Sequence, residues 1–321
     1  MVPSDLTPAG TPPMFTLGLN TFFTATRWPR PEEKFRIARE LGVGTVQYSL
    51  DGFSPCWPAS WRRGLARSIR RASEKHGVGI HSTFTGAGHH FDSFLLHPER
   101  EWREHSLRWF EAAIRFSAEI GSQGAGGFMG ALSLPDVASP RIVRARINGY
   151  IEALLRLTSV ARECGQQFFM IEPMSVRREP PSTIAESVDL MERLNRHAEI
   201  PVRLCLDVGH IRAVTAPTAE DRNPCAWLRR CGRYAEAVHV HQTDAAASRH
   251  WPFTPQNNRK GIIDGRKVLC AIAASGTTKT TLIIEVFFAP YEPMDERVLP
   301  DLHASVMYWK NCLCSTAPAS D

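Results

Sequence analysis

The chain has 321 residues, of which 43% are hydrophobic and 22% charged, and this composition excludes an intrinsically disordered protein because that much apolar surface can offset the entropy of ordering the chain. The formal net charge of +5 is small for this length and the basic residues are not gathered in one stretch, so nucleic-acid binding is not expected. No apolar run reaches the roughly 18 residues that a membrane-spanning helix needs.

The first residues predict a short leader and not a targeting signal. Residues 1–14 are rich in proline and lack a basic start followed by a hydrophobic stretch, which is typical of a flexible leader on a cytoplasmic protein. No linker divides residues 15–313, which we expect to form one domain, followed by a tail at 314–321. The eight cysteines form no CxxC pair, so we expect reduced thiols.

Strand-like and helix-like segments alternate along the whole chain. The predicted strands are 15–22, 44–51, 79–86, 124–130, 167–174, 202–210, 236–244 and 281–288. The predicted helices are 31–41, 59–76, 102–120, 140–164, 183–197, 221–231, 264–275 and 296–313. Most end in a glycine of the kind found just past a helix, at Gly42, Gly77, Gly121, Gly165, Gly232 and Gly276, and Thr183 with Glu186 has the spacing of a capping box.

Regular alternation of this kind predicts a parallel sheet covered by helices. Eight units without an open edge favour a single (β/α)8 TIM barrel over a doubly wound sheet. The glycine-rich segment 124–130 is the weakest strand, and if it were a loop the barrel would be incomplete.

Acid and imidazole side chains stand at the ends of the last four predicted strands: Glu172, Asp207, His241 and Glu285. Singly, each acid could be a helix cap or a solvated loop residue. Because they follow successive strands, whose carboxyl ends converge in a barrel, we expect a joint site for one divalent cation. His239 shares a strand face with His241 but lies farther from the carboxyl end, so we expect it in the core or behind the ligands.

These motifs resemble the xylose isomerase-like superfamily over residues 15–313. The resemblance depends on Glu172-Pro173, Asp207-Val208-Gly209-His210, His241-Gln242-Thr243-Asp244 and the IIE that ends at Glu285. Within the superfamily the chain is similar to the ketose 3-epimerase and sugar-phosphate epimerase branch, whose Glu, Asp, His and Glu quartet holds one Mn, Mg or Co ion. Zn also suits such ligands.

The resemblance implies further contacts with a small sugar. His210 would touch the substrate or orient Glu172, unless it is hydrogen-bonded to the barrel wall. His81, taken as the end of its strand, would lie near a substrate hydroxyl. Asn20 and Gln47 would line the site or satisfy loop backbone.

The two glutamates suggest the reaction. If a divalent cation polarises the carbonyl of a ketose, Glu172 and Glu285 can act as base and acid on the two faces of a cis-enediolate, which inverts C3. Protonation of the neighbouring carbon would instead give aldose–ketose isomerisation, so that alternative stays open.

Basic residues near the predicted site suggest a phosphorylated substrate. The segment after the seventh strand carries Arg249, His250, Arg259 and Lys260. Arg177 and Arg178 follow Glu172. The segment 172–183 is similar to enzymes acting on tetrulose phosphates. The alternatives are a solvated basic loop and a free ketose as the substrate.

Two other classes of protein are alternatives to a sugar epimerase. An endonuclease IV-type repair enzyme shares these elements but needs a three-zinc cluster, and segment 124–130 has no histidine for it. A non-catalytic sugar-binding barrel would not need two proton-transfer groups beside the cation. A homo-oligomer is expected if the apolar helix 296–313 pairs between copies, although the ordinary alternative is packing on the barrel.

Overall fold

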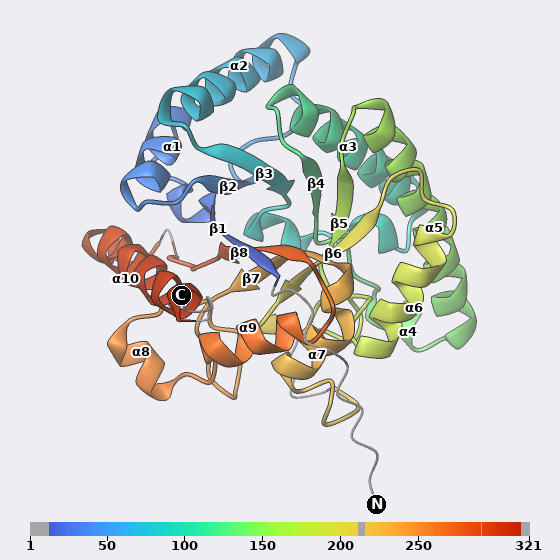
Figure 1. The fold of residues 1–321 in the computed structure, drawn as a ribbon. Coiled ribbons are helices and arrows are strands. Elements are labelled where there is room, and N and C mark those ends of the chain that lie inside the picture. Colours follow the sequence, from blue (N-terminus) through green and yellow to red (C-terminus); the bar gives the residue numbers. More distant parts are fainter. Residues whose placement is uncertain (1–12, 211–215, 290, 316–321) are drawn as a thin grey trace, which may run out of the picture.

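The structure is a computed structural model that describes residues 13–210, 216–289 and 291–315. Its eight parallel strands form a closed barrel in which β1 pairs with both β2 and β8 (Figure 1). The strands are β1 (Met14–Asn20), β2 (Thr45–Ser49), β3 (Gly79–Phe84), β4 (Gly124–Gly127), β5 (Phe168–Ile171), β6 (Val202–Asp207), β7 (Ala235–Val240) and β8 (Lys279–Ile284). The expected single (β/α)8 TIM barrel is confirmed.

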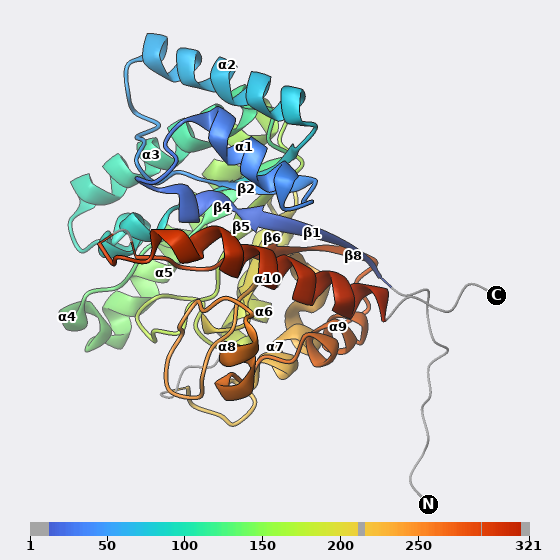
Figure 2. The ribbon, with the colours of Figure 1, turned by 90° about the vertical axis from the view of Figure 1, so that its left-hand side faces the viewer.

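The helices surround the barrel, as the side view shows (Figure 2). They are α1 (Pro31–Glu40), α2 (Ala59–His76), α3 (Arg100–Glu119), α4 (Leu134–Val137), α5 (Pro140–Glu163), α6 (Ile184–Asn195), α7 (Pro224–Cys231), α8 (Pro255–Lys260), α9 (Gly265–Ala273) and α10 (Asp295–Cys314). The short helices α4 and α8 lie in segments for which the sequence predicted no helix. None of the described helices has the length and apolarity to cross a bilayer.

The glycines of β4 are required by the packing inside the barrel. A Cβ on Gly124 would lie 2.2 Å from the ring of Phe168, and a Cβ on Gly126 would lie 2.1 Å from the carbonyl oxygen of Met170. Both distances are far below van der Waals contact, so only glycine lets β4 approach β5 here. The segment that looked most like a loop is therefore a strand that pairs with β3 and β5.

The predicted terminating glycines follow the helices in the structure. Gly42, Gly77, Gly121, Gly165 and Gly276 have positive φ angles. Gly232 directly follows Cys231, the last residue of α7, but has φ of −57° because the chain continues into a short 3-10 turn. Thr183 Oγ1 accepts the Glu186 N–H, and the Glu186 carboxylate accepts the N–H of Ser182, one residue earlier than a standard capping box.

The barrel has two apolar layers, one between strands and helices and one inside the barrel. The inner layer contains Phe84, Phe168, Met170, Cys205, Ala237 and Ile283. Successive strand residues point to opposite faces, so the residues two positions farther along β5, β6, β7 and β8 also point inward. These residues are Glu172, Asp207, His239 and Glu285. The inner apolar layer is thus the floor beneath a polar layer.

The strands and helices extend from Met14 to Cys314. Residues 1–12 of the predicted leader and 316–321 of the predicted tail lie outside the described residues. Helix α10 buries Val298, Leu302, Val306 and Trp309, so its apolar face packs on the barrel and is not offered to another copy. The eight cysteines are free, in agreement with reduced thiols.

One charge is buried in α1 without a carboxylate partner within ion-pair distance. Lys34 is 8% exposed, and its Nζ donates to Thr24 Oγ1 and lies 5.7 Å from the centre of the Tyr48 ring. Burial lowers the pKa of Lys34 to about 8, because the charged form is poorly solvated there. Below this pH the folded chain must hold a buried ammonium group.

Replacing Lys34 by Met should stabilise the fold near neutral pH by about 2 kcal/mol, because the buried charge is removed while the stem is kept. The folded pKa lies below the unfolded value, so the unfolded chain binds more protons above about pH 8 and the wild type gains stability as pH rises. The advantage of the variant should therefore shrink toward about pH 10. Urea unfolding at both pH values tests this, with the exposed Lys279→Met as the control. A Lys34→Met variant less stable than the wild type at pH 7 would contradict it.

Candidate active site

A cavity of about 630 Å³ opens at the carboxyl ends of the strands. Glu172, Glu285 and Asn20 line it from β5, β8 and β1, and His210 lines it from the end of β6. Its wider part is aromatic, with Phe22 and Phe287 stacked at 4.9 Å between ring centres. Charged side chains thus meet apolar surface in a space of the size that holds small ligands.

Strand geometry delivers the three carboxylates to the same place. Asp207 is the last residue of β6, and Glu172 and Glu285 come directly after β5 and β8. The backbone ladder continues through both glutamates, since Glu172 N donates to Gly127 O and Glu285 N donates to Val240 O. Their inward direction is therefore fixed by the same pairing that closes the barrel.

His239 lies among these carboxylates. Its Nδ1 is 3.0 Å from Glu285 Oε2, 3.5 Å from Glu172 Oε1 and 3.8 Å from Asp207 Oδ2. Its Nε2 lies 2.7 Å from Gln47 Oε1, which can only accept, so Nε2 donates a hydrogen there. Burial acts to lower the pKa of His239, but Cys205, Glu285 and Glu172 raise it well above its usual value, so Nδ1 holds a proton toward the carboxylates unless a cation takes that place.

This arrangement fits a cation. Glu172 Oε1 and Oε2, Asp207 Oδ2 and His239 Nδ1 are buried and complete no hydrogen bond. One ligand atom from each of Glu172, Asp207, His239 and Glu285 can be chosen so that all lie within 4.8 Å of one another. Converging buried oxygens and a nitrogen lone pair repel unless positive charge lies between them. The donor set suits a divalent ion such as Mn, Mg, Co or Zn.

His241, the imidazole expected in the quartet, lies on the other side of Asp207. Its Nε2 is 2.9 Å from Asp207 Oδ1. The Gly209 Cα closes over this ring, since a Cβ there would lie 2.1 Å from His241 Cε1. The structure thus joins Glu172, Asp207 and Glu285 as expected, with His239 as the imidazole nearest to all three. His239 was expected behind the ligands.

Burial and neighbouring histidines set the charges of the site. Burial acts to raise the pKa of Glu172, but His210 and His239 more than offset it and lower that pKa to about 2. Burial likewise acts to raise the pKa of Asp207, which His210 and His241 lower well below its usual value. Both carboxyl groups are therefore ionised near neutral pH, the form that binds a cation and accepts a proton.

His210 and Asn20 hold the two glutamates. His210 Nδ1 lies 3.2 Å from Glu172 Oε1, within ion-pair distance. Burial acts to lower the pKa of His210, but Asp207, Glu172 and Glu285 raise it to about 10, so a charged ring faces this carboxylate. Asn20 Nδ2 donates to Glu285 Oε1 at 2.9 Å and to Gln47 Oε1 at 2.9 Å. Gln47 was expected to line the site or satisfy a loop, but it is fully buried and binds side chains.

The loop after β7 is tied down over the site. Gln242 and Trp251 exchange two backbone hydrogen bonds of 2.8 and 2.9 Å, and Phe287 N donates to His250 O at 3.0 Å. These bonds place Ser248, Arg249 and His250 in the cavity wall. We call residues 242–251 the strap.

His81 does not occupy its expected place. It was taken as the end of its strand, but β3 continues to Phe84, and His81 packs against Phe168 of the inner apolar layer with ring centres 5.4 Å apart. It is absent from the cavity lining, so a contact with a substrate hydroxyl is not supported.

The expected phosphate residues also lie elsewhere. Arg259 and Lys260 are in α8, with Lys260 Nζ 4.1 Å from the centre of the Trp251 ring, and Arg178 lies 3.6 Å from Glu179. None of the three lines the cavity. Among its described lining residues, Arg249 is the only Lys or Arg. The sequence could not show this, because the path of the strap decides which basic residue turns inward.

His250 and Asp51 are cavity residues that the site prediction omitted. His250 has a left-handed backbone, with φ of 49°, and stacks on His241 with ring centres 3.9 Å apart. Asp51 accepts backbone N–H groups of Ala87 and Gly88 at the rim. Asp51 was visible as a polar residue after a strand, and His250 belongs to the basic segment that follows the seventh strand.

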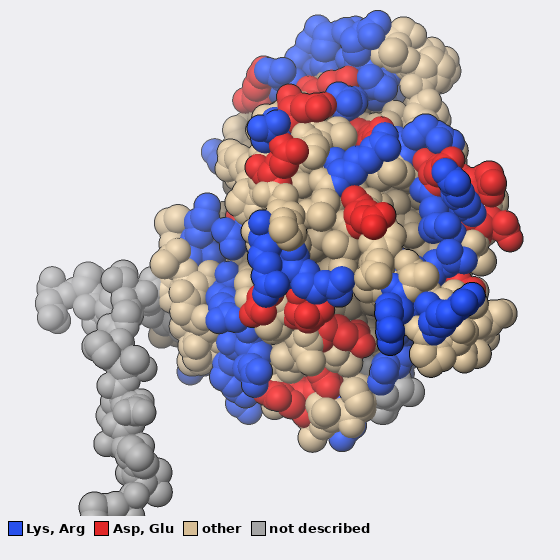
Figure 3. Space-filling model, turned by 90° about the vertical axis from the view of Figure 1, so that its right-hand side faces the viewer, with Lys and Arg blue, Asp and Glu red and all other residues tan. Residues whose placement is uncertain are grey.

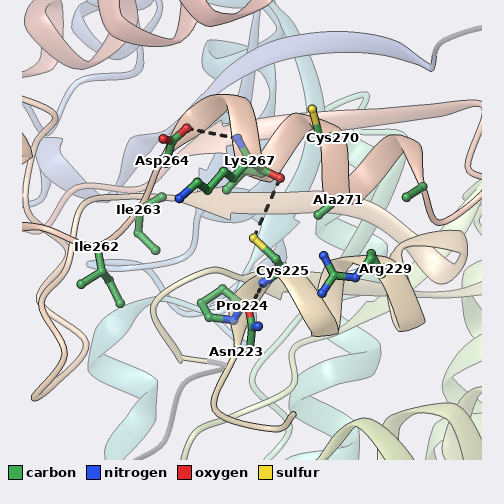
Figure 4. Close-up of a pocket in the computed structure, with 12 residues that line it drawn as sticks. Asn223, Pro224, Cys225, Arg229, Ile262, Ile263, Asp264, Lys267, Cys270 and Ala271 are labelled. Carbon is green, nitrogen blue, oxygen red and sulfur yellow. Dashed lines mark hydrogen bonds between the residues drawn. The ribbon is translucent and has the colours of Figure 1, made fainter. Parts of the chain in front are cut away.

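A second hollow of about 520 Å³ lies between α7 and α9, away from the strand ends (Figure 4). Cys225, Arg229 and Lys267 border it, and Cys225 Sγ lies 3.9 Å from the Lys267 carbonyl oxygen. Its one carboxylate, Asp264, caps α9 by accepting Lys267 N–H. It therefore lacks the converging charges of the barrel cavity.

On the face drawn in Figure 3, basic and acidic side chains are interspersed and form no continuous basic stripe.

Comparison with known proteins identifies the family. A family model described as xylose isomerase-like TIM barrel matches residues 35–302. The chain belongs to this family. It is 30% identical over 296 residues to D-erythrulose 1-phosphate 3-epimerase of Brucella abortus, covering 92% of this chain and 95% of that protein. The expected class of enzyme, an isomerase, is confirmed by these relatives.

Solved structures agree with the barrel. A Rhodospirillum rubrum protein assigned as a xylose isomerase is 28% identical, with a TM-score of 0.86, covering 95% of this chain and all (100%) of that one. D-psicose 3-epimerase from Clostridium cellulolyticum, solved with D-tagatose, is 13% identical with a TM-score of 0.68 over 93% of this chain and 99% of that one. The second likeness shows the shared fold.

Replacing Gln47 by Leu should weaken Mn²⁺ binding by about 10- to 100-fold, because His239 loses the partner that directs its Nδ1 lone pair toward the carboxylates. Titration calorimetry with Mn²⁺ measures this. Ser82→Ala is the matched control, since it removes another hydrogen bond of Gln47 but keeps the one to His239. An unchanged affinity in Gln47→Leu would assign the imidazole ligand to His241 instead.

Proposed function

We propose that the chain is a divalent-metal-dependent 3-epimerase of a short ketose phosphate. The observation that carries this is the position of Glu172 and Glu285, which line one cavity from β5 and β8 and have carboxylate oxygens 3.5 and 3.0 Å from the same imidazole nitrogen. Two such groups at one substrate carbon are what inversion requires. The relationship to an enzyme named D-erythrulose 1-phosphate 3-epimerase supports the substrate class.

The proposed ligands of the cation are Glu172, Asp207, Glu285 and an imidazole of β7. His239 is favoured by its distances, and His241 stays a candidate because it contacts Asp207. When bound, the cation supplies positive charge that polarises the carbonyl of the ketose and makes the adjacent C–H more acidic. Mn²⁺ is our choice, since three oxygen donors and one nitrogen suit it.

The protein's own residues move the proton. Glu172 is ionised and can accept the C3 proton from one side, while Glu285, held by Asn20, can donate from the other side a proton that it has taken up from solvent. Glu172 then releases its proton to solvent and Glu285 takes up another, which restores the starting state. His210 keeps Glu172 in place through its Nδ1. The stacked rings of Phe22 and Phe287 give the sugar an apolar surface that excludes water.

Arg249 and Ser248 are the proposed phosphate contacts, in place of Arg178, Arg259 and Lys260. Arg249 Nε bonds Asp244 Oδ2 at 3.0 Å, which fixes a guanidinium group that has further donors. Ser248 Oγ is buried beside the cavity and completes no hydrogen bond. A fixed cation beside an unpartnered hydroxyl suits a phosphate group.

The other functions have less support. Aldose–ketose isomerisation needs the same proton acceptor but gives no role to a second glutamate. A repair nuclease would need a basic surface for the phosphate backbone, and a single Arg among the described lining residues does not supply one. We place the enzyme in the cytoplasm on the support of its free cysteines.

Glu172→Gln and Glu285→Gln should each lower epimerisation by about 100- to 10,000-fold, because an amide keeps an oxygen for the cation but cannot accept a proton. Each variant should still exchange C3 hydrogen with D₂O in one epimer only, namely the epimer whose hydrogen faces the remaining glutamate. Proton NMR of each epimer incubated with each variant measures this.

The exchange pattern separates the mechanisms. Exchange of the same epimer in both variants would contradict the two-sided scheme, and epimerisation by the wild type without solvent exchange would indicate a hydride shift. An aldose product would indicate isomerisation.

Replacing Arg249 by Ala should raise KM for a tetrulose phosphate by at least about 10-fold, because a charge-assisted contact is lost. KM for the unphosphorylated ketose should change little. Arg259→Ala is the matched control, since Arg259 belongs to α8 and does not line the cavity. Equal effects of Arg249→Ala on both substrates would remove the phosphate assignment.

A further inference from the structure

A third hollow, of about 530 Å³, lies outside the barrel. Its lining residues come mainly from α4, α5 and α6, which lie together on one flank of the molecule (Figure 1). It shares no lining residue with the cavity at the strand ends. The volume is in the range that holds small ligands. The hollow is therefore a candidate binding site that is separate from the proposed active site.

Much of the wall of this hollow is apolar. Leu132 and Leu190 are buried, Val143 and Ile147 are half-buried, and Val137 is 41% exposed. An aliphatic chain in the hollow would remove this surface from water, which favours binding. The apolar part thus accepts a hydrocarbon body.

The wall also carries positive charge that is not compensated. Arg144 and Arg177 line the hollow and are exposed, and neither has a carboxylate within ion-pair distance among the residues that the structure describes. The two carboxylates of the wall are already engaged, because Asp189 lies 3.4 Å from Arg193 and Glu186 accepts a backbone N–H. Guanidinium groups bind carboxylates through paired N–H donors. The two free arginines therefore suit an organic anion.

A buried hydroxyl group in the wall has no partner. Tyr150 lines the hollow and is 1% exposed, and its hydroxyl completes no hydrogen bond with any described residue. Burial raises the pKa of Tyr150, so the hydroxyl keeps its proton near neutral pH and can donate it. A buried donor without an acceptor is unfavourable. A carbonyl oxygen of a ligand would remove this cost.

We infer that the hollow binds a short aliphatic oxo acid. Its carboxylate would bind the exposed Arg144 and Arg177 at the mouth, its chain would cover the apolar wall, and its carbonyl oxygen would accept from the buried Tyr150. The inference goes beyond the proposed function and does not depend on epimerase activity, because the two sites have no lining residue in common.

Titration calorimetry on the purified full-length chain tests the class of ligand with three probes. Hexanamide should bind at least about 10-fold more weakly than hexanoate, because it lacks the charge that the arginines recognise. The third probe, 5-oxohexanoate, should bind about 3- to 10-fold more tightly than hexanoate, because its carbonyl gives the buried hydroxyl an acceptor.

Variants locate the bound acid. Arg144→Gln and Arg177→Gln should each weaken 5-oxohexanoate by about 10-fold. Arg141→Gln is the matched control, since Arg141 is an exposed arginine of α5 that does not line the hollow. Tyr150→Phe keeps the ring, so hexanoate should bind as before while the preference for 5-oxohexanoate is lost. A merely structural role of Tyr150 would change the affinity for both acids equally and would contradict the inference.

Two further results would overturn the inference. One is the absence of binding by either acid, and a dimer that Val143→Glu dissociates would then assign the hollow to a contact between copies of the chain. The other is binding that Arg249→Ala weakens and Arg144→Gln leaves unchanged, because the acid would then lie in the barrel cavity. Circular dichroism checks that each variant is folded.

Discussion

The site depends on negative charge held inside the barrel. Glu172 and Asp207 are almost completely buried, and Glu285 is mostly buried, yet all three lie around the same imidazole nitrogen, His239 Nδ1. Such a group is costly unless a positive charge compensates it. Two hydrogen bonds keep these side chains directed at one another. One joins Gln47 to His239, and the other joins Asn20 to Glu285.

The backbone of the barrel stabilises this arrangement. Each ligand residue ends or directly follows a strand, and the ladder bonds of Glu172 and Glu285 fix their directions before any side chain is considered. The inner apolar layer, which includes Phe84 and Ile283, lies beneath them and excludes water. The glycines of β4 contribute to this layer, because they leave room for Phe168 and Met170 beside the site.

The sequence predicted the barrel well because its signals are local. Hydrophobic strands, amphipathic helices and terminating glycines all depend on neighbouring residues, and even Gly232, which lacks a positive φ, follows the last residue of its helix. The three carboxylates were also predictable, since each stands at the end of a strand. The choice between His239 and His241 was not, because both point inward and only the partners from β1 and β2 distinguish them.

Residues in loops were harder to predict. Arg259 and Lys260 are in the segment expected to bind phosphate, but α8 carries them away from the cavity while the strap turns Arg249 and His250 inward. The error at His81 is of another kind, because the predicted strand 79–86 already ran past this residue, and β3 does continue three residues beyond it, to Phe84. The path of the loop after β7 comes from long-range geometry that no local pattern encodes.

The strap makes the two sides of the cavity mouth different. Backbone hydrogen bonds join its two ends, Gln242 and Trp251, and another joins His250 to Phe287. This part of the cavity wall is therefore held in place by the backbone. On another part of the rim, Phe91 and Tyr291 are 94% and 83% exposed. The mouth of the cavity thus has one side held by backbone hydrogen bonds and another side edged by exposed aromatic rings.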